Sequence, residues 1–311
     1  MLVDKQEDVD LNPKLKQGDG DEVSPVTTAA AKVTCTSVSR TNCSSPTEHA
    51  DGRNEGRGDD DDDDDDDGHR YGNFKHYYEY HTASRDRFKG VVPGSFLRLW
   101  QELQEPDTFT ILDIGCNEGD LTVELLTLVQ AELPVSVCCL AYGLDFDSVL
   151  LSAARERHAH VHNLQFFQVD VMAGENMKEF LMELEQEHIS VSLVVCLRVS
   201  MWVHLNMGDE GLLRLLRLLG DAACHSALLL DPQKYSYYKK ACSRNTKLGR
   251  PGFPYSLDDL SLSNRELPAY CLQFFNDKFK LSILMHKDIA KWGGTLLFLM
   301  KGAQSQQKGL K

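Results

Sequence analysis

The sequence predicts an α/β fold built on a seven-stranded, mostly parallel sheet with an antiparallel hairpin at one edge. From Thr110 onward, short apolar runs of strand-forming residues alternate with amphipathic stretches, which is the pattern of βαβ units. The predicted strands are 110–115, 137–145, 164–171, 191–199, 226–231, 281–286 and 294–302. The last two strands are separated by too few residues for a crossover helix, so we expect them to pair antiparallel.

Helices are predicted between these strands because apolar residues recur there at helical spacing. The predicted helices are 120–133, 147–159, 175–187, 209–223 and 235–245. In 209–223, leucines form one broad face and leave Arg214 and Arg217 for the opposite side, a pattern typical of a helix packed on a core.

Composition divides the chain into a tail and a folded part. Residues 1–68 contain 19 acids and 7 bases, including an unbroken Asp run at 59–67. Such a segment cannot bury enough apolar surface to fold, so we predict a disordered acidic tail. We further predict an aromatic and basic arm at 69–109, a core at 110–303 and a short C-terminal tail at 304–311. The arm is expected to cover the site as a lid.

Some classes of protein are disfavoured by what the sequence lacks. The 9 cysteines include no CxxC pair, which argues against a structural zinc site, and no metal is expected. The N-terminus MLVDKQEDVD lacks the basic and apolar regions of a signal peptide, and no apolar stretch approaches the roughly 18 residues that span a bilayer. We expect a cytoplasmic protein, with the nucleus as an alternative, that acts as a monomer without membrane contact.

The segment TILDIGCNEGDLT, residues 110–122, carries the clearest chemical signal. An apolar strand ends in Asp113 and is followed by Gly115, Gly119 and an amphipathic helix. This order places a tight turn and a helix N-terminus at the carboxyl edge of the sheet, where a nucleotide-like ligand can bind. The spacing matches neither GxGxxG nor GxxxxGK, so a dinucleotide or a triphosphate in this loop is disfavoured.

Two further strands carry an acid at or near their ends. Asp145 ends the second predicted strand and can accept hydrogen bonds from two ribose hydroxyls, as an acid does in dinucleotide folds. Asp170 lies near the end of the third strand, where it can accept from an adenine amino group. Each acid alone could equally be a helix cap or a solvated turn. Together with Asp113 at one sheet edge, they favour a cofactor site.

A basic segment with interleaved tyrosines follows the fifth predicted strand. Residues 234–250 contain no acid and hold Lys234, Lys239, Lys240, Arg244, Lys247 and Arg250 beside Tyr235, Tyr237 and Tyr238. Cations among aromatic rings suit a phosphate end with stacked nucleotides, and a merely solvated helix face is the alternative. The arm adds similar candidates: Asn73, Lys75, His76, Tyr77 and Tyr80. His204 is expected to be structural.

Five segments resemble the Bicoid-interacting-protein-3 domain methyltransferases. They are YGNFKHYYEYH (71–81), LDIGCNEGDLT (112–122), LDFDS (144–148), MWVHLNMGDEGL (201–212) and DPQKY (231–235). MWVHLN is typical of this family rather than of methyltransferases in general. The resemblance covers residues 70–302 and none of the acidic tail. It implies a class I, Rossmann-like methyltransferase fold, S-adenosylmethionine as cofactor, and methylation of a phosphate at RNA 5′ ends.

Within that family, the chain in its compact size most resembles the members that methylate the 5′-monophosphate of histidine tRNA and microRNA precursors. The resemblance therefore implies an RNA 5′ end as the partner. The resemblance implies cofactor contacts from Asn117, Asp145, Asp170, Val171, Leu197 and Arg87, with Arg85 as the alternative to Arg87. Asp113 and Gly115 complete the predicted cofactor set. The predicted RNA contacts are Asn73, His76, Tyr77, Lys234, Lys239, Lys240 and Arg244. No catalytic residue is assigned, and the candidates for positioning are Tyr80, Lys239 and Lys240.

The implied reaction requires positioning more than proton transfer. A phosphomonoester has its second pKa at about 6, so the acceptor oxygen is already anionic at neutral pH. Two departures from the family lie on the substrate side: Arg198 stands where relatives commonly have a small hydroxyl residue, and DPQKY replaces EPQPW. Three alternatives stay open: a 5′ γ-phosphate capping enzyme of small nuclear RNA, a small-molecule methyltransferase, and a non-catalytic RNA-binding module with the same fold.

Overall fold

The computed structural model describes residues 68–72, 90–104, 107–173, 175–262, 266–289 and 294–301. Its strands are β1 (Thr108–Ile114), β2 (Cys138–Asp145), β3 (Leu164–Gln168), β4 (Leu193–Leu197), β5 (Ala227–Asp231), β6 (Leu281–Ile289) and β7 (Gly294–Lys301). Its helices are α1 (Gly68–Tyr71), α3 (Gly94–Gln104), α4 (Asp120–Glu132), α5 (Ser148–Arg157), α6 (Asn176–Gln186), α7 (Ser200–Ala222), α8 (Tyr235–Lys247) and α9 (Leu267–Phe279). Residues 1–67 of the predicted acidic tail and the predicted C-terminal tail lie outside the described residues.

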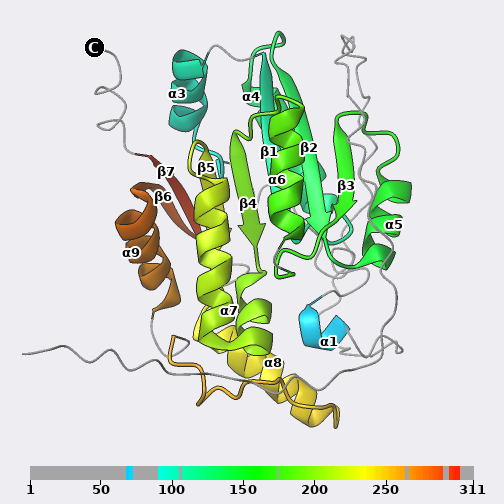
Figure 1. Cartoon of the computed structure of the whole chain (residues 1–311), viewed down its shortest axis with the longest axis vertical. Helices are drawn as coiled ribbons and strands as arrows, with labels where there is room; N and C mark the ends of the chain where they lie inside the picture. Colours follow the sequence, from blue (N-terminus) through cyan, green and yellow to red (C-terminus); the bar gives the residue numbers. More distant parts are fainter. Residues whose placement is uncertain are drawn as a thin grey trace, which may run out of the picture.

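The described strands form one sheet in the order β3-β2-β1-β4-β5-β7-β6. Strands β1 to β5 run parallel, whereas β7 pairs antiparallel with both β5 and β6. In the register of the sheet, Leu112 of β1 pairs with Tyr142 of β2 and with Val194 of β4. The predicted seven-stranded, mostly parallel sheet with an antiparallel edge hairpin is therefore confirmed (Figure 1).

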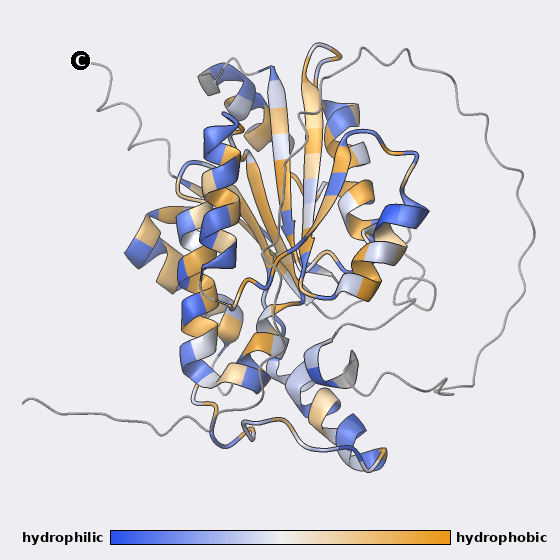
Figure 2. Cartoon of the chain, turned by 45° about the vertical axis from the view of Figure 1, so that its right-hand side comes forward, coloured by the Kyte–Doolittle hydropathy of each residue, from blue (hydrophilic) through white to orange (hydrophobic). Residues whose placement is uncertain are grey.

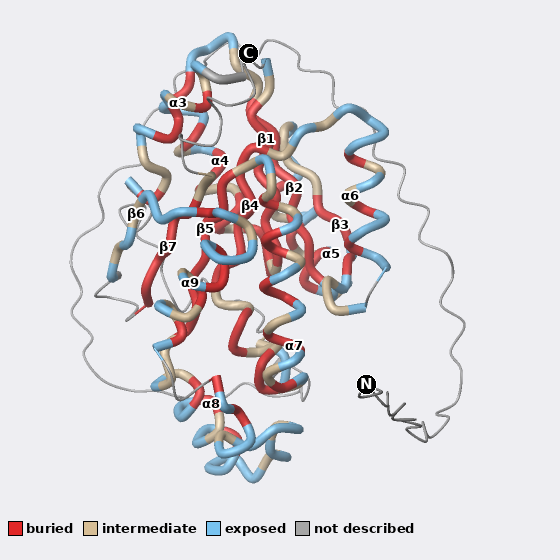
Figure 3. Tube along the Cα trace, turned by 60° about the vertical axis from the view of Figure 1, so that its left-hand side comes forward, coloured by how far each residue is buried: buried red, intermediate tan, exposed pale blue. Residues whose placement is uncertain are grey.

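Helices cover both faces of the sheet, which explains why its central strands are apolar throughout. Every residue of β4 and β5 is buried. Helices α6, α7 and α9 cover one face, where Phe180, Leu215 and Phe275 belong to one core cluster. Helices α3 and α4 cover the other face with Trp100 and Leu125. Figure 2 shows apolar strands between helices with hydrophilic outer surfaces, and Figure 3 shows the same strands as mostly buried.

Several described helices depart from the sequence prediction, which includes neither α1 nor α3. Helix α7 begins at Ser200 rather than at Asp209, because the MWVHLN segment is already helical. Gly208, at φ 70° and ψ −171°, kinks the helix just before the predicted start. Helix α9 has no counterpart in the prediction, although Pro268 in its first turn and buried apolar residues at helical spacing are ordinary helix signals.

Part of the predicted arm is packed into the core. In α3, the Phe96 ring lies 5.0 Å from that of Phe298, and the Trp100 ring lies 4.9 Å from that of Phe109, between centroids. Outside the described residues lie Asn73, Lys75, His76, Tyr77, Tyr80, Arg85 and Arg87. A lid formed by residues 73–89 therefore stays a prediction.

The start of the arm is anchored at the carboxyl edge of the parallel strands. These strands point toward the side of the molecule where α1 and α8 lie (Figure 1). Asn206 Nδ2 donates to Arg70 O at 2.8 Å, and Arg70 Nε donates to Asn206 Oδ1 at 3.3 Å. The Tyr71 ring meets Phe146, just after β2, edge to face at 5.6 Å. The MWVHLN segment therefore supplies an anchor for α1.

Gly72 also lies close to that segment. Its φ is 80°, and a Cβ atom at this position would lie 2.2 Å from Nε1 of Trp202. Only glycine fits such a backbone conformation against an aromatic ring without displacement.

We predict that Gly72→Ala detaches α1 from α7. Trp202 is one of 3 tryptophans, so a fluorotryptophan-labelled chain should show one resonance that shifts in this variant by ¹⁹F NMR. Gly90→Ala is the matched control, since Gly90 also has a positive φ of 71° but a Cβ there would meet nothing within 4 Å. An unchanged Trp202 resonance in Gly72→Ala would contradict the docking of α1.

Candidate active site

The glycine turn between β1 and α4 is the centre of the candidate site. Gly115, Asn117 and Gly119 all have left-handed backbone conformations, with φ of 77°, 53° and 82°. The amides of Gly115 and of the residue after it both donate to Leu144 O, at 2.8 and 3.0 Å, which fastens the turn to β2. A Cβ atom on Gly115 would lie 2.3 Å from Val199 Cγ2. Glycine there lets the turn pass close to the end of β4.

Asp145, the last residue of β2, holds this turn from the neighbouring strand. It is 8% exposed; its Oδ2 accepts from Asn117 N at 2.9 Å and its Oδ1 from Asp147 N at 3.1 Å. Burial raises the pKa of this carboxyl, and the backbone donors oppose the rise. Each carboxylate oxygen can accept a further hydrogen bond, as from a ribose hydroxyl. The structure thus brings together two of the predicted cofactor residues.

Asp113 lies beneath the turn. It is 3% exposed, and its Oδ2 accepts from Thr122 Oγ1 at 2.6 Å, which connects the end of β1 to the first turn of α4. Burial raises the pKa of Asp113 to about 6; the Thr122 hydroxyl opposes the rise and the charge of Asp145 adds to it. The geometry gives Asp113 a role in fixing the turn, and its direct contact with a cofactor stays a prediction.

The other described cofactor candidates lie along the same edge. Strand β3 ends at Gln168, so the exposed Asp170 and the half-buried Val171 follow in the loop beyond it. Asp170 Oδ1 accepts from Met172 N at 2.8 Å. Leu197, 8% exposed, is the last residue of β4. The cofactor contacts of these residues stay predictions.

This set of residues fits S-adenosylmethionine. The turn leads into the N-terminus of α4, Asp145 offers a carboxylate to a diol, and Val171 and Leu197 offer apolar surface. In sheet order, Asp170 after β3, Asp145 on β2 and the turn after β1 would receive adenine, ribose and methionine in succession. The ends of β4 and β5 lie next along the same edge.

The outer side of the turn carries ion pairs that the sequence does not predict. Glu118 is 2% exposed, and its Oε2 lies 3.1 Å from Nη1 of Arg157, which also lies 2.9 Å from Asp120 Oδ2. Arg157 is the last residue of α5, so these ion pairs connect α5 to the start of α4. The two partners are far apart in sequence and form no recognisable pattern, which is why they could not be predicted.

The other half of the edge carries both departures from the family pattern. Arg198 directly follows β4, and its Nε lies 3.3 Å from Oδ2 of Asp231, the last residue of β5. Gln233 connects the two loops: its Oε1 accepts two bonds from the first residues of α7, at 2.9 and 3.1 Å, and its Nε2 donates to Arg198 O. Lys234, a predicted RNA contact, pairs with Asp288 of β6 at 3.2 Å.

Helix α8 begins at this half of the edge and carries most of the described RNA candidates. Lys239, Lys240 and Arg244 are exposed. Lys239 Nζ lies 4.8 Å from the centre of the Tyr235 ring, and Lys240 Nζ lies 5.6 Å from that of Tyr237. The structure therefore places the predicted cations and tyrosines together on one helix, and their contact with RNA stays a prediction.

His204 is structural, as predicted. It is fully buried, with Nδ1 3.1 Å from the Tyr238 hydroxyl and Nε2 2.7 Å from Asp209 Oδ1. Burial lowers the pKa of His204, and the bond and charge of Asp209 oppose the change. The network fixes α8 to α7, so His204 supports the acceptor side without reaching it.

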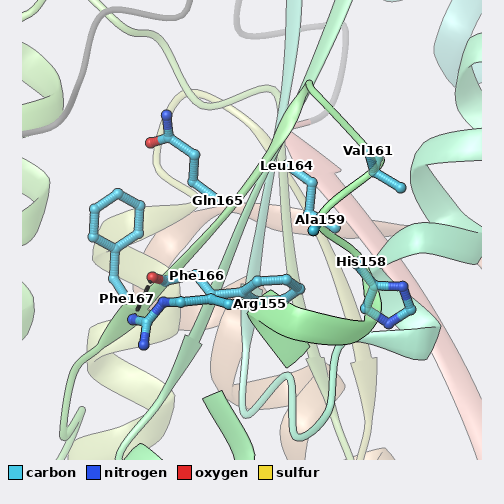
Figure 4. Close-up of a pocket in the computed structure, with 8 residues that line it drawn as sticks. All are labelled: Arg155, His158, Ala159, Val161, Leu164, Gln165, Phe166 and Phe167. Atoms are coloured by element: carbon cyan, nitrogen blue, oxygen red, sulfur yellow. Dashed lines mark hydrogen bonds between the residues drawn. The ribbon is translucent and has the colours of Figure 1, made fainter. Parts of the chain in front are cut away.

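A cavity of about 320 Å³ lies between the end of α5 and β3 (Figure 4). Its lining residues are Arg155, His158, Ala159, Val161, Leu164, Gln165, Phe166 and Phe167. None of the predicted site residues lines it. Within the described ranges, no three His, Cys, Asp or Glu side chains gather as metal ligands would, and none of the helices has the length and apolar character that a membrane-spanning helix needs.

Sheet order, glycine turn and strand-end acids together define a class I S-adenosylmethionine-dependent methyltransferase fold. Among solved structures, an S-adenosylmethionine-dependent methyltransferase from Clostridium acetobutylicum matches with a TM-score of 0.43 at 13% identity, over 75% of this chain and 99% of that one.

Sequence comparison identifies the family within this class. The family model described as Bicoid-interacting protein 3 (Bin3) matches residues 191–286. The RNA 5′-monophosphate methyltransferase of Bos taurus is 30% identical over 241 residues, 73% of this chain and 79% of that protein. The pre-miRNA 5′-monophosphate methyltransferase of Xenopus laevis is 30% identical over 200 residues, 60% of this chain and 74% of that protein. The chain belongs to the Bicoid-interacting protein 3 family.

The buried charge of Asp113 gives a prediction for the pH dependence of stability. Because the folded pKa of about 6 exceeds the ordinary value of 3.8, the folded state holds this proton more tightly, and the resulting stabilisation is lost as pH rises through about 6. In Asp113→Asn this loss disappears. Relative to the original chain, the free energy of unfolding of the variant should therefore rise by roughly 3 kcal/mol between pH 4 and pH 7.

Urea denaturation of both proteins without cofactor, at pH intervals across this range, measures the difference. The prediction concerns how the difference changes with pH, since the buried amide of Asn can itself shift stability by a constant amount. Parallel pH profiles for the two proteins would contradict the raised pKa of Asp113.

Proposed function

We propose that this chain transfers a methyl group from S-adenosylmethionine to the 5′-monophosphate of small RNAs, with microRNA precursors and histidine tRNA as the first substrates to test. The names of the bovine and Xenopus relatives support this substrate class. The observation that carries the proposal is the position of α8, whose cations and tyrosines follow shortly after the end of β5, at the same sheet edge as the glycine turn. We expect a monomer that works in the cytoplasm or nucleus without a metal ion.

The acceptor needs orientation more than activation. A 5′-monophosphate carries close to two negative charges at neutral pH, so its oxygen is already a nucleophile and no general base is required. The cofactor supplies a methyl group on a positively charged sulfur. Lys239 and Lys240 hold the non-reacting phosphate oxygens, and Tyr235 and Tyr237 stack on nearby bases. Holding the reacting oxygen in line with the methyl carbon supplies much of the rate.

A 5′ γ-phosphate capping activity is the second candidate. The U6 snRNA methylphosphate capping enzyme Amus of Drosophila melanogaster is 29% identical over 185 residues, 55% of this chain and 55% of that protein. A triphosphate end carries more charge than a monophosphate end and places its terminal phosphate further from the first base. The two activities therefore differ in the distance and charge that α8 has to accommodate.

We predict that the full-length chain adds the mass of one or more methyl groups to a 5′-monophosphate RNA, detected by mass spectrometry, and that the product resists phosphatase. The same RNA with a 5′-triphosphate or a 5′-hydroxyl should react far more slowly or not at all. Preferred methylation of the triphosphate would favour the capping activity. Methylation independent of the 5′ group would contradict both.

Charge variants on α8 sharpen this experiment. Lys239→Gln combined with Lys240→Gln should raise the KM for RNA by roughly tenfold or more, because two phosphate-binding charges are lost. Lys178→Gln on α6 is the control, since Lys178 is also exposed but lies on a helix that covers a sheet face. An equal effect of the two sets of substitutions would exclude a specific role for α8.

A further inference from the structure

The corner formed by the ends of β4 and β5 contains an unusual ion pair. Arg198 Nε lies 3.3 Å from Asp231 Oδ2, and Asp231 is only 1% exposed. The other oxygen of Asp231 accepts from the amide of Thr295, at the start of β7, at 3.4 Å. The guanidinium carbon of Arg198 also lies 5.1 Å from the centre of the Tyr237 ring. One side chain thus contacts β5 and α8 at the acceptor half of the edge.

The backbone at Arg198 is held in a conformation that favours this contact. Its φ is 62°, in the left-handed region that residues other than glycine rarely adopt. The Arg198 carbonyl accepts a hydrogen bond from Gln233 Nε2, so the strained residue is fixed from the loop after β5. A strained backbone that is held by its surroundings in this way marks a position where the side chain has to point in one direction.

Tyr237 connects this pair to the cations of α8. Arg198 and Lys240 both lie within the range of cation–π contact of the Tyr237 ring, with Lys240 Nζ at 5.6 Å from its centre. Tyr237 lies in the first turn of α8. Because the ammonium group of Lys240 lies over its ring, the orientation of the ring affects where that group is held.

Two of the cations at this corner are matched by carboxylates. Arg198 is matched by Asp231, and Lys234 is matched by Asp288. Lys239 and Lys240 form no ion pair with a carboxylate in the described part of the chain. Their two charges correspond to the roughly two negative charges of a 5′-monophosphate. Burial raises the pKa of the Asp231 carboxyl and the charge of Arg198 opposes the rise, so loss of Arg198 would leave a buried carboxyl at this corner without its counter-charge.

We propose that Arg198 is a positioning residue of the acceptor site, which cancels the charge of Asp231 and holds Tyr237, and through it Lys240, for a 5′ phosphate. The inference rests on the proposed function. Arg198 acts through its two neighbours, and it does not itself bind the phosphate. Arg198, which stands where relatives commonly have a small hydroxyl residue, then pairs with Asp231, the acid of the DPQKY segment.

A double-mutant cycle on Arg198 and Asp231 tests this role in the full-length chain. Arg198→Met removes the charge and should raise the KM for 5′-monophosphate RNA at least about tenfold while kcat changes by less than about threefold. Arg198→Lys keeps the charge and should recover most of that loss. Adding Asp231→Asn to Arg198→Met removes the unpaired buried carboxyl, so the KM should fall at least about threefold below that of Arg198→Met, although the contact of Arg198 with Tyr237 stays lost.

Two controls separate this role from a folding defect. The affinity for S-adenosylhomocysteine, by calorimetry, should stay within about twofold in every variant, because the cofactor half of the edge is untouched. A KM of the double variant as high as that of Arg198→Met would overturn the proposal, since it would mean that pairing with Asp231 has no part in the role of Arg198. An unchanged KM in Arg198→Met would overturn it as well. Absence of methyl transfer by the original chain would reject the proposed function itself, and the inference with it.

Discussion

The hydrogen bond from the Asn117 amide to the Asp145 carboxylate is the contact on which the cofactor end of the molecule depends. It spans 2.9 Å and joins the turn after β1 to the end of β2. Asn117 has a φ of 53°, and this bond helps to hold the turn in that unfavourable conformation. Two further contacts hold the same turn: Thr122 donates a hydrogen bond to Asp113, and Glu118 pairs with Arg157. The start of α4 is thereby placed at the sheet edge.

The glycine turn and the strand-end acids beside it could be predicted because their signals are local in sequence. Strand patterns, two glycines and strand-end acids each lie within a short segment, and parallel strands necessarily end at one edge. The contacts that stabilise this part of the edge could not be predicted. Glu118 meets Arg157 only because α5 packs beside the turn, and Asp145 bonds Asn117 only because β1 and β2 are neighbours. The sequence predicts the start of α7 at Asp209 instead of Ser200, because Gly208 interrupts the helix without ending it.

The acceptor half was predictable in composition but not in arrangement. The cations and tyrosines of α8 are visible in the sequence, whereas their relation to the sheet depends on which strands are adjacent. Leu197 pairs with Asp231 in the register of β4 and β5, so the residue after Leu197 is brought beside the last residue of β5. Arg198, which in sequence appears only as a departure from relatives, thereby acquires its partner. Similarly, the MWVHLN segment is recognisable as a motif, but its anchoring of α1 is a tertiary feature.

Calorimetric titration of S-adenosylhomocysteine into the full-length chain and into Asp145→Ala tests the central claim most directly. Asp145 is assigned both to hold the glycine turn and to face the ribose, so its loss should remove measurable binding while the core, which lies away from this edge, stays folded. We expect micromolar or tighter binding by the original chain, on the order of that usual for cofactors at cellular concentration, and none by the variant. Equal affinity of the two proteins would contradict it.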